Sequence, residues 1–157
     1  MAKHSRLLVV DACVARSAGE TKHPVSSSCR NALLAIRDIC HRVIMTEPIQ
    51  SEWDRHKSRF TRRWFMSMVA RKKIQRSAGV RVDLVGRTLT GLSATEQECL
   101  EKDLCLIEAA CDGDGIVVTR DDEFVQIWQK CQSQFHLAKP ITWINPVTDD
   151  TGVFEHL

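Results

Sequence analysis

Four acidic residues stand at positions where their carboxylates could bind a metal ion: Asp11, Glu52, Asp103 and Asp121. Asp11 directly follows the apolar run 7–10, and Asp121 follows the apolar run 116–118 after two residues. Ligands of an open α/β sheet bind beyond the carboxyl ends of its strands, so both aspartates are expected at such a crevice. The alternative for each is a cap on the following helix or turn, a common role of aspartate.

The other two acids lie beside the apolar stripes of predicted helices. At 100° per residue, Asp103 lies about 60° from the centre of its stripe, and Glu52 lies roughly 60–90° from the centre of its own. A carboxylate flanked by apolar residues is costly unless it is paired or binds a metal ion. The stripes comprise Leu100, Leu104, Ile107 and Cys111 on one helix, and Ile49, Trp53, Phe60 and Trp64 in the other region.

Four carboxylates that converge without matching basic partners repel one another unless a cation lies between them. Arg120 could neutralise one of them but not all four. Oxygen ligands in that number suit Mg²⁺ or Mn²⁺, and these residues therefore predict a site for such an ion. The alternative is a solvated acidic rim.

Two other kinds of chemistry find little support in the sequence. The six histidines are scattered, and they form no Ser/His/Asp or Cys/His arrangement typical of a nucleophilic enzyme. A nucleotide-binding α/β protein would need a glycine-rich loop after its first strand, where this chain has Gly19 alone.

Charge is strongly segregated along the chain, although the net charge is only +2. Lys and Arg accumulate between Arg55 and Arg76 with no acid among them, whereas Asp and Glu predominate between Ser93 and Phe124. A cationic stretch can follow a phosphate backbone, and the alternative is a solubilising surface. Phe60 and Trp64 within it favour core packing over base stacking. The candidate nucleic-acid contacts are Arg59, Arg62, Arg63, Arg71, Lys72 and Lys73.

The elements that must position these residues alternate between strands and helices. Apolar runs predict strands over 6–10, 42–45, 116–119 and 140–144. Capping and periodicity predict helices over about 27–41, from Thr46 onwards, 93–111 and 123–131, with a basic helix that ends near Gly79. Residues 80–92 are expected to be irregular or to hold a short strand, and 147–157 to form a polar tail. The alternation predicts a three-layer α/β/α sandwich with a mostly parallel sheet, in one domain over 1–157.

Composition agrees with a cytoplasmic protein without a membrane span. The chain has 157 residues, 43% hydrophobic and 27% charged, as is ordinary for one globular domain. Asp11 interrupts the first apolar run after four residues, which is too short for a secretion signal. The seven cysteines include no pair at zinc-finger spacing and favour reduced thiols over disulfides or a zinc site.

Four segments of the chain resemble motifs of the PIN-domain nucleases, and two of them are the most specific. Residues 103–110, Asp-Leu-Cys-Leu-Ile-Glu-Ala-Ala, resemble the family's helix D-x-x-I-x-A-A. After a glycine-containing turn, residues 117–124 are similar to V-T-x-D-x-x-F, and residues 8–11 and 46–53 match its opening strand and second acidic segment. The resemblance extends from Leu7 to about Pro146 and is strongest to the small ribonucleases that act as toxins in prokaryotic toxin–antitoxin pairs.

The resemblance implies an endoribonuclease that hydrolyses RNA phosphodiester bonds with Mg²⁺ or Mn²⁺. It implies that the four acids are catalytic and that Asp11, Asp103 and Asp121 bind the metal, with Thr119 in support and Asp122 as a rival to Asp121. Partners implied are RNA, an antitoxin and a second copy of the chain. The alternative is a PIN-like module that binds RNA or protein without cutting. The basic region over about 55–79 is longer than in the smallest toxins.

Overall fold

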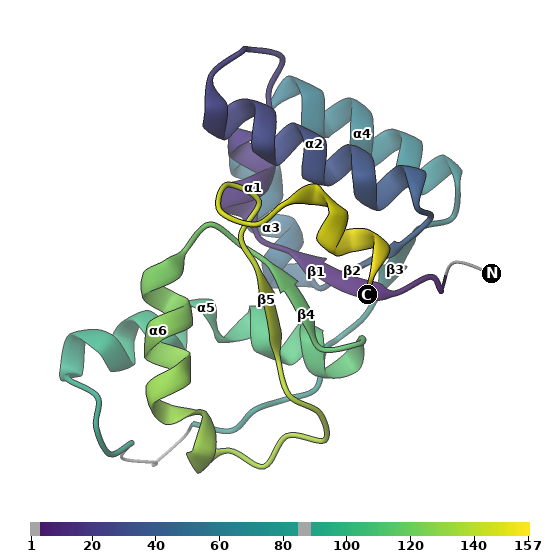
Figure 1. Cartoon of the computed structure of the whole chain (residues 1–157). Coiled ribbons are helices and arrows are strands. Elements are labelled where there is room, and N and C mark those ends of the chain that lie inside the picture. The colour runs from purple at the N-terminus through teal and green to yellow at the C-terminus, as the bar shows by residue number, and fades with distance from the viewer. Residues whose placement is uncertain (1–3, 85–88) are drawn as a thin grey trace.

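A single sheet of five parallel strands runs through the protein, in the order β3-β2-β1-β4-β5. The computed structural model describes residues 4–84 and 89–157 (Figure 1). Four strands match the predicted runs to within two residues, whereas the edge strand β3 was not predicted. The strands are β1 (Leu7–Val10), β2 (Arg42–Met45), β3 (Ile74–Arg76), β4 (Ile116–Val118) and β5 (Thr142–Ile144).

Helices cover both faces of this sheet, which confirms the predicted α/β sandwich. In Figure 1, α2 and α4 lie on one side of the strands and α5 and α6 on the other. The helices are α1 (Ala12–Ser17), α2 (Pro24–Asp38), α3 (Glu47–His56), α4 (Arg59–Ala70), α5 (Ala94–Asp112) and α6 (Asp122–Cys131). Short 3₁₀ helices follow at Gln132–Gln134 and Thr151–Glu155. Within the described residues, none of the helices combines the length and apolar character needed to span a bilayer.

The strand order reverses beside β1, because the chain proceeds to β2 on one side and later returns to β4 on the other. Such a reversal opens a crevice at the carboxyl ends of the two diverging strands, where α/β proteins bind their ligands. Asp11 and Thr119 directly follow these two strand ends. The Asp11 N–H donates to the Val118 carbonyl at 2.9 Å, which holds the two strand ends together.

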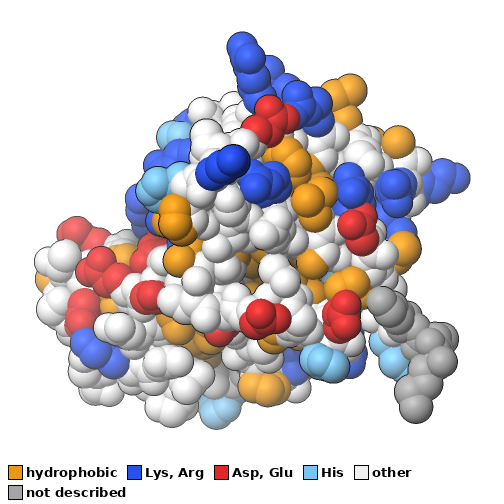
Figure 2. All heavy atoms as spheres, turned by 45° about the horizontal axis from the view of Figure 1, so that its top comes forward, with side chains coloured by type: hydrophobic (Ala, Val, Ile, Leu, Met, Phe, Trp, Pro, Cys, Tyr) orange, Lys and Arg blue, Asp and Glu red, His pale blue; other side chains and the backbone are white. Residues whose placement is uncertain are grey.

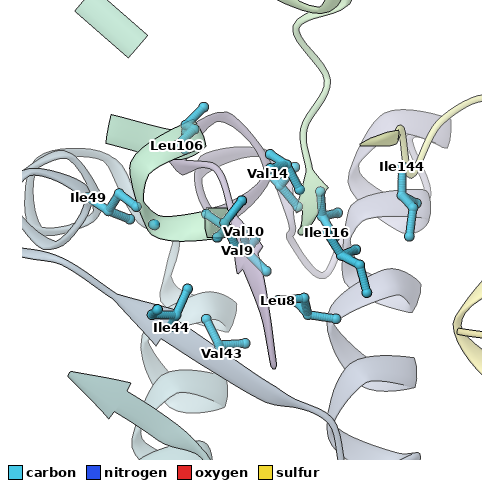
Figure 3. Packing of buried hydrophobic residues seen from close by; sticks show 14 of the residues in the cluster. Leu8, Val9, Val10, Val14, Val43, Ile44, Ile49, Leu106, Ile116 and Ile144 are labelled. Atoms are coloured by element: carbon cyan, nitrogen blue, oxygen red, sulfur yellow. The ribbon is translucent and has the colours of Figure 1, made fainter. Parts of the chain in front are cut away.

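The core surrounds β1, whose four residues are all buried. Figure 3 shows Leu8, Val9 and Val10 of β1 among apolar side chains of neighbouring elements. Trp53 of α3 is fully buried, and its indole N–H donates to the Val10 carbonyl at 3.0 Å. This bond and the burial of the indole fix α3, and with it Glu52, over the end of β1.

Two predicted helix limits were wrong for identifiable reasons. The helix expected from about residue 27 begins at Pro24, because the His23 imidazole accepts a hydrogen bond from the Val25 N–H at 3.3 Å and caps it. The basic helix expected to reach Gly79 ends at Ala70, since the chain then enters β3. Ser58 starts that helix by accepting the Thr61 N–H, and it therefore separates α3 from α4.

The C-terminal segment expected to be a polar tail packs against the protein. Phe154 is buried at 1% exposure, and its 3₁₀ helix contacts α2. His41, also buried, accepts the Arg6 N–H at Nδ1 (3.0 Å), so its Nε2 carries the proton and donates to the Phe154 carbonyl at 2.7 Å. The buried Phe154 thus anchors the terminus, and Val153 and Leu157 also pack against the core.

Candidate active site

The four predicted acids line one cavity of about 200 Å³ at the carboxyl ends of β1 and β4. Asp11 follows β1 and Asp121 lies at the start of α6, while Glu52 comes from α3 and Asp103 from α5. The contact between α3 and α5 brings the two helical acids towards the strand ends. Four separate segments of the chain therefore contribute acidic groups to the same cavity.

The Asp11 carboxylate is engaged at this cavity and does not cap α1. Although Asp11 occupies the N-cap position, its side chain makes no capping hydrogen bond. Its Oδ2 accepts hydrogen bonds from Thr119 Oγ1 at 2.7 Å and from the Cys13 thiol at 3.2 Å. The capping alternative therefore does not account for this side chain.

Asp121 and Asp122 differ in their positions relative to the cavity. Asp121 lines it, while its Oδ1 also accepts the Phe124 N–H at 3.0 Å and caps α6. Asp122 accepts a hydrogen bond from Asn145 Nδ2 at 3.0 Å and is not among the cavity-lining residues of the described chain. Thr119 Oγ1 accepts the Asp121 N–H at 3.0 Å, so its single hydroxyl connects Asp11 to Asp121.

Of the four acids, Asp103 is the one whose negative charge receives the least stabilisation from hydrogen bonds and ion pairs. Within residues 4–84 and 89–157, its carboxylate has no hydrogen-bond or ion-pair partner. The pKa of Asp103 is raised from 3.8 to about 6, first by burial and second by the negative charge of Asp11. Asp121 and Glu52 contribute smaller increases to this value, and Lys102 contributes a decrease. The acids therefore lie near enough to repel one another, as the metal hypothesis requires.

Glu52 has a basic partner, contrary to the prediction that the four acids lack such partners. It forms an ion pair with Arg55 Nη1 at 3.2 Å, and its other carboxylate oxygen lies 3.7 Å from His56 Nε2, a contact that is an ion pair only with a protonated imidazole. The Glu52 side chain is 47% exposed. Arg120, considered as a neutralising group, instead donates to Ser17 Oγ at 2.5 Å. Glu52 lines the cavity while it keeps these contacts on α3.

Two thiols border the acids but are poor ligands at neutral pH. Burial, followed by the charge of Asp11, raises the pKa of Cys13 to about 12. Burial, followed by the charge of Asp103, raises the pKa of Cys105 to about 12. A metal-binding thiol must be a thiolate, so ionised ligands at this site are carboxylates. All seven cysteines, each within the described chain, are unpaired.

The donor set fits Mg²⁺ or Mn²⁺ in chemistry and location, although the ligands are not fully assembled. In the part of the chain that the structure describes, no three Asp, Glu, His or Cys side chains are arranged to hold a metal ion. Asp103 is nevertheless partly buried without a partner and shares its cavity with Asp11 and Asp121. Adjustment of side chains such as Glu52 would be needed to complete such a site.

The basic residues of α4 and the following turn are mostly exposed. Trp64 among them is buried and donates to the Leu33 carbonyl at 2.6 Å, which confirms core packing rather than base stacking. Figure 2 shows many Lys and Arg side chains in its upper part, with several Asp and Glu side chains at the lower left. Arg59, Arg62, Arg71 and Lys72 are exposed, Arg63 pairs with Glu20, and Lys73 donates to the Cys40 carbonyl.

Three basic side chains that line the acidic cavity were not predicted: Arg16, His56 and Lys102. His56 lies four residues after Glu52 on the same helix, so helical spacing could have indicated it. Arg16 could not have been assigned without α1, a helix that was not predicted. A groove of about 370 Å³ between α2 and α4, lined by Arg30, Arg37 and Arg63, was also missed.

Comparison with protein-family models, with curated proteins and with solved structures gave no match.

Replacing the buried Thr119 by valine should weaken Mn²⁺ binding by about 10- to 100-fold, the range found for residues that orient metal ligands. Valine keeps the shape but removes the donor to Asp11 and the acceptor for the Asp121 N–H. Isothermal titration with Mn²⁺ measures the effect. Thr119→Ser, which keeps the hydroxyl, should bind Mn²⁺ like the wild type; equal affinities of Thr119→Val and wild type would contradict this role.

Asp103→Asn should stabilise the metal-free protein at pH 8 but not at pH 4. Because the pKa of Asp103 is higher in the folded state, its ionisation destabilises the fold as pH rises through about 4–6. A shift of this size corresponds to about 3 kcal/mol, which solvent screening reduces to about 1–2 kcal/mol. Urea denaturation in EDTA at both pH values measures the difference. An equal effect of the substitution at pH 4 and pH 8 would contradict the electrostatic origin.

Proposed function

We propose that this protein is a metal-dependent endoribonuclease that hydrolyses RNA phosphodiester bonds at the four-carboxylate cavity. The observation that carries the proposal is the partly buried Asp103 carboxylate, which has no partner among the described residues and whose pKa is raised first by burial and then by the charges of Asp11, Asp121 and Glu52. A buried anionic cluster costs stability, and a bound cation would remove that cost. A carboxyl group with a raised pKa beside other acids in a crevice, as at Asp103, is typical of a functional site.

In this proposal Asp11, Asp103 and Asp121 hold Mg²⁺ or Mn²⁺, and Glu52 completes the catalytic set. When bound, the ion stabilises negative charge on the phosphate oxygens and makes a water molecule easier to deprotonate. Thr119 fixes the orientation of Asp11 through the 2.7 Å hydrogen bond. Lys102 lines the same cavity, where its ammonium group can contact the phosphate of the substrate.

The charge distribution supports a polyanionic substrate. Arg59, Arg62, Arg71 and Lys72 present exposed cations on α4 and the turn after it. RNA is chosen over DNA on the PIN-domain resemblance alone. We also propose an antitoxin partner, a role as a toxin and a homodimer, and these rest on the same resemblance alone.

A second candidate is a PIN-like module that binds RNA or protein without cutting. The observation that favours it is the ion pairing of Glu52 with Arg55 and the lack of three ligands already assembled in the described residues. The two candidates differ in whether divalent metal binds at the acids. A metal-binding test therefore separates them before any RNA target is known.

Mn²⁺ at 100 times its dissociation constant should stabilise the protein by about 2.7 kcal/mol, or roughly 5–11 °C in melting temperature. Thermal melts at pH 7.5 with Mn²⁺ and with EDTA measure the shift. Asp103→Asn should abolish it, whereas Asp122→Asn, a matched change outside the cavity wall, should retain it. A shift of the same size in Asp103→Asn would place the metal elsewhere and would contradict the proposed site.

A further inference from the structure

A second cavity of about 210 Å³ adjoins the carboxylate cavity between α3 and α5. The two cavities share Asp11, Glu52, Lys102 and Asp103 as lining residues, so they meet at the proposed metal site. The rest of the second wall is mainly apolar and comprises Pro48, Ile49, Ser51, Cys105 and Leu106, beside the shared Ala12. A molecule that occupied both cavities would therefore meet charged groups at one end and apolar groups at the other.

The apolar wall belongs to the rigid core of the protein. Ile49 and Leu106 are only 2% and 3% exposed, and Figure 3 shows them on α3 and α5 beside the Val10 end of β1. Ser51, by contrast, is exposed on α3. The cavity thus has a preformed apolar wall and a solvent-facing side at Ser51, which are general features of ligand pockets.

We propose that this second cavity, hereafter the base pocket, receives one nucleobase of the RNA strand next to the phosphate that is cut. This inference rests on the proposed function, and it specifies that the RNA is unpaired where the nuclease binds it. A nucleotide joins an apolar planar ring to an anionic phosphate. The ring fits the apolar wall, and the phosphate would meet Lys102 and the metal ion proposed between the carboxylates. A space of about 210 Å³ admits a single base and not a base pair. The substrate is therefore an unpaired segment of RNA, whose bases are free to turn outwards.

The walls also indicate how selective the base pocket is. Its lining residues include no aromatic side chain on which a base could stack, and Ser51 and Lys102 are the polar groups outside the acids. Contact with the base is then mainly a fit of shape, which distinguishes ring size better than hydrogen-bonding pattern. An apolar side chain of a partner protein would suit the same wall, but it would bring no phosphate to the carboxylate end.

The experiment compares nucleoside 5′-monophosphates with ribose 5-phosphate, which lacks the base. Isothermal titration in Mn²⁺ should give about tenfold tighter binding of the better nucleotide, because its base buries apolar surface against this wall. Ser51→Trp places an indole at the exposed side of the base pocket and should reduce nucleotide affinity to that of ribose 5-phosphate, whose own affinity stays unchanged. Thr95→Trp, an exposed hydroxyl residue near the start of α5, is the matched control and should bind as the wild type does.

Equal affinity for ribose 5-phosphate and every nucleotide, or no binding of either, would overturn the base pocket. Retention of the base-dependent affinity in Ser51→Trp with an unchanged melting temperature would overturn it as well. RNA cleavage is measured separately. Cleavage without a base contribution would refute the pocket and leave the nuclease, whereas a base contribution without cleavage would leave a nucleotide pocket and refute the nuclease.

Discussion

Asp103→Asn is expected to reduce RNA cleavage by about 10³-fold in kcat/KM, and Asp11→Asn by a similar factor. Each substitution replaces an anionic oxygen of the proposed metal site by a neutral amide of nearly the same shape. Loss of one group that stabilises charge in a transition state typically costs about 10²–10³-fold, and weaker metal binding adds to that loss. A fluorogenic single-stranded RNA in Mn²⁺ provides the measurement.

The control for this experiment is Asp122→Asn, which changes the same chemical group one residue from Asp121. Because Asp122 is bonded to Asn145 and lies outside the cavity wall, its variant should keep activity within about threefold of the wild type. Misfolding cannot explain a loss in Asp103→Asn if that variant is at least as stable as the wild type, as expected in EDTA at pH 8. Wild-type activity in both Asp11→Asn and Asp103→Asn would refute the catalytic role of these acids.

Trp53→Ala should have the largest effect on stability, a loss of about 3–5 kcal/mol in the free energy of unfolding. The indole is fully buried and packs against Trp64 and Phe65, with ring centroids 6.1 and 5.8 Å away. It also supplies the N–H that satisfies the Val10 carbonyl. Since proteins of this size are stable by only about 5–15 kcal/mol, much of the total would be lost.

Trp53→Phe separates the two contributions of this side chain. The phenyl ring keeps much of the packing but leaves the buried Val10 carbonyl without its donor, which should cost about 1–3 kcal/mol. Urea denaturation followed by circular dichroism gives both values. A loss below about 1 kcal/mol in Trp53→Ala would show that α3 is held over β1 by other contacts.

The sheet order was the part of the fold that sequence patterns could not give. Apolar runs locate a strand but not its neighbours, and the reversal of order beside β1 depends on how α2, α4 and α5 pack. The strand β3 escaped prediction because Ile74-Gln75-Arg76 at the sheet edge has a single apolar residue and no buried run. The six-residue helix α1 is likewise too short to show a hydrophobic period.

The location of the candidate site was more predictable than its interactions. Strand ends and helical spacing were enough to predict that four acids lie together, and the structure has them lining one cavity: Asp11, Glu52, Asp103 and Asp121. The rotation of Glu52 towards Arg55 and the choice of Asp121 over Asp122 depend on side-chain contacts between distant segments. Sequence spacing does not encode such contacts. The base pocket also forms where two distant segments, α3 and α5, pack together, so it could not be predicted either.

The most direct test of the account is a crystal structure of the protein soaked in Mn²⁺ at pH 7.5, with anomalous scattering used to locate the metal. We predict an anomalous peak between Asp11 and Asp103, with a carboxylate oxygen of Asp121 close to the same ion. A fully soaked crystal with no peak at this cavity, or with peaks only at other carboxylates, would contradict the proposed metal site and the nuclease activity that depends on it.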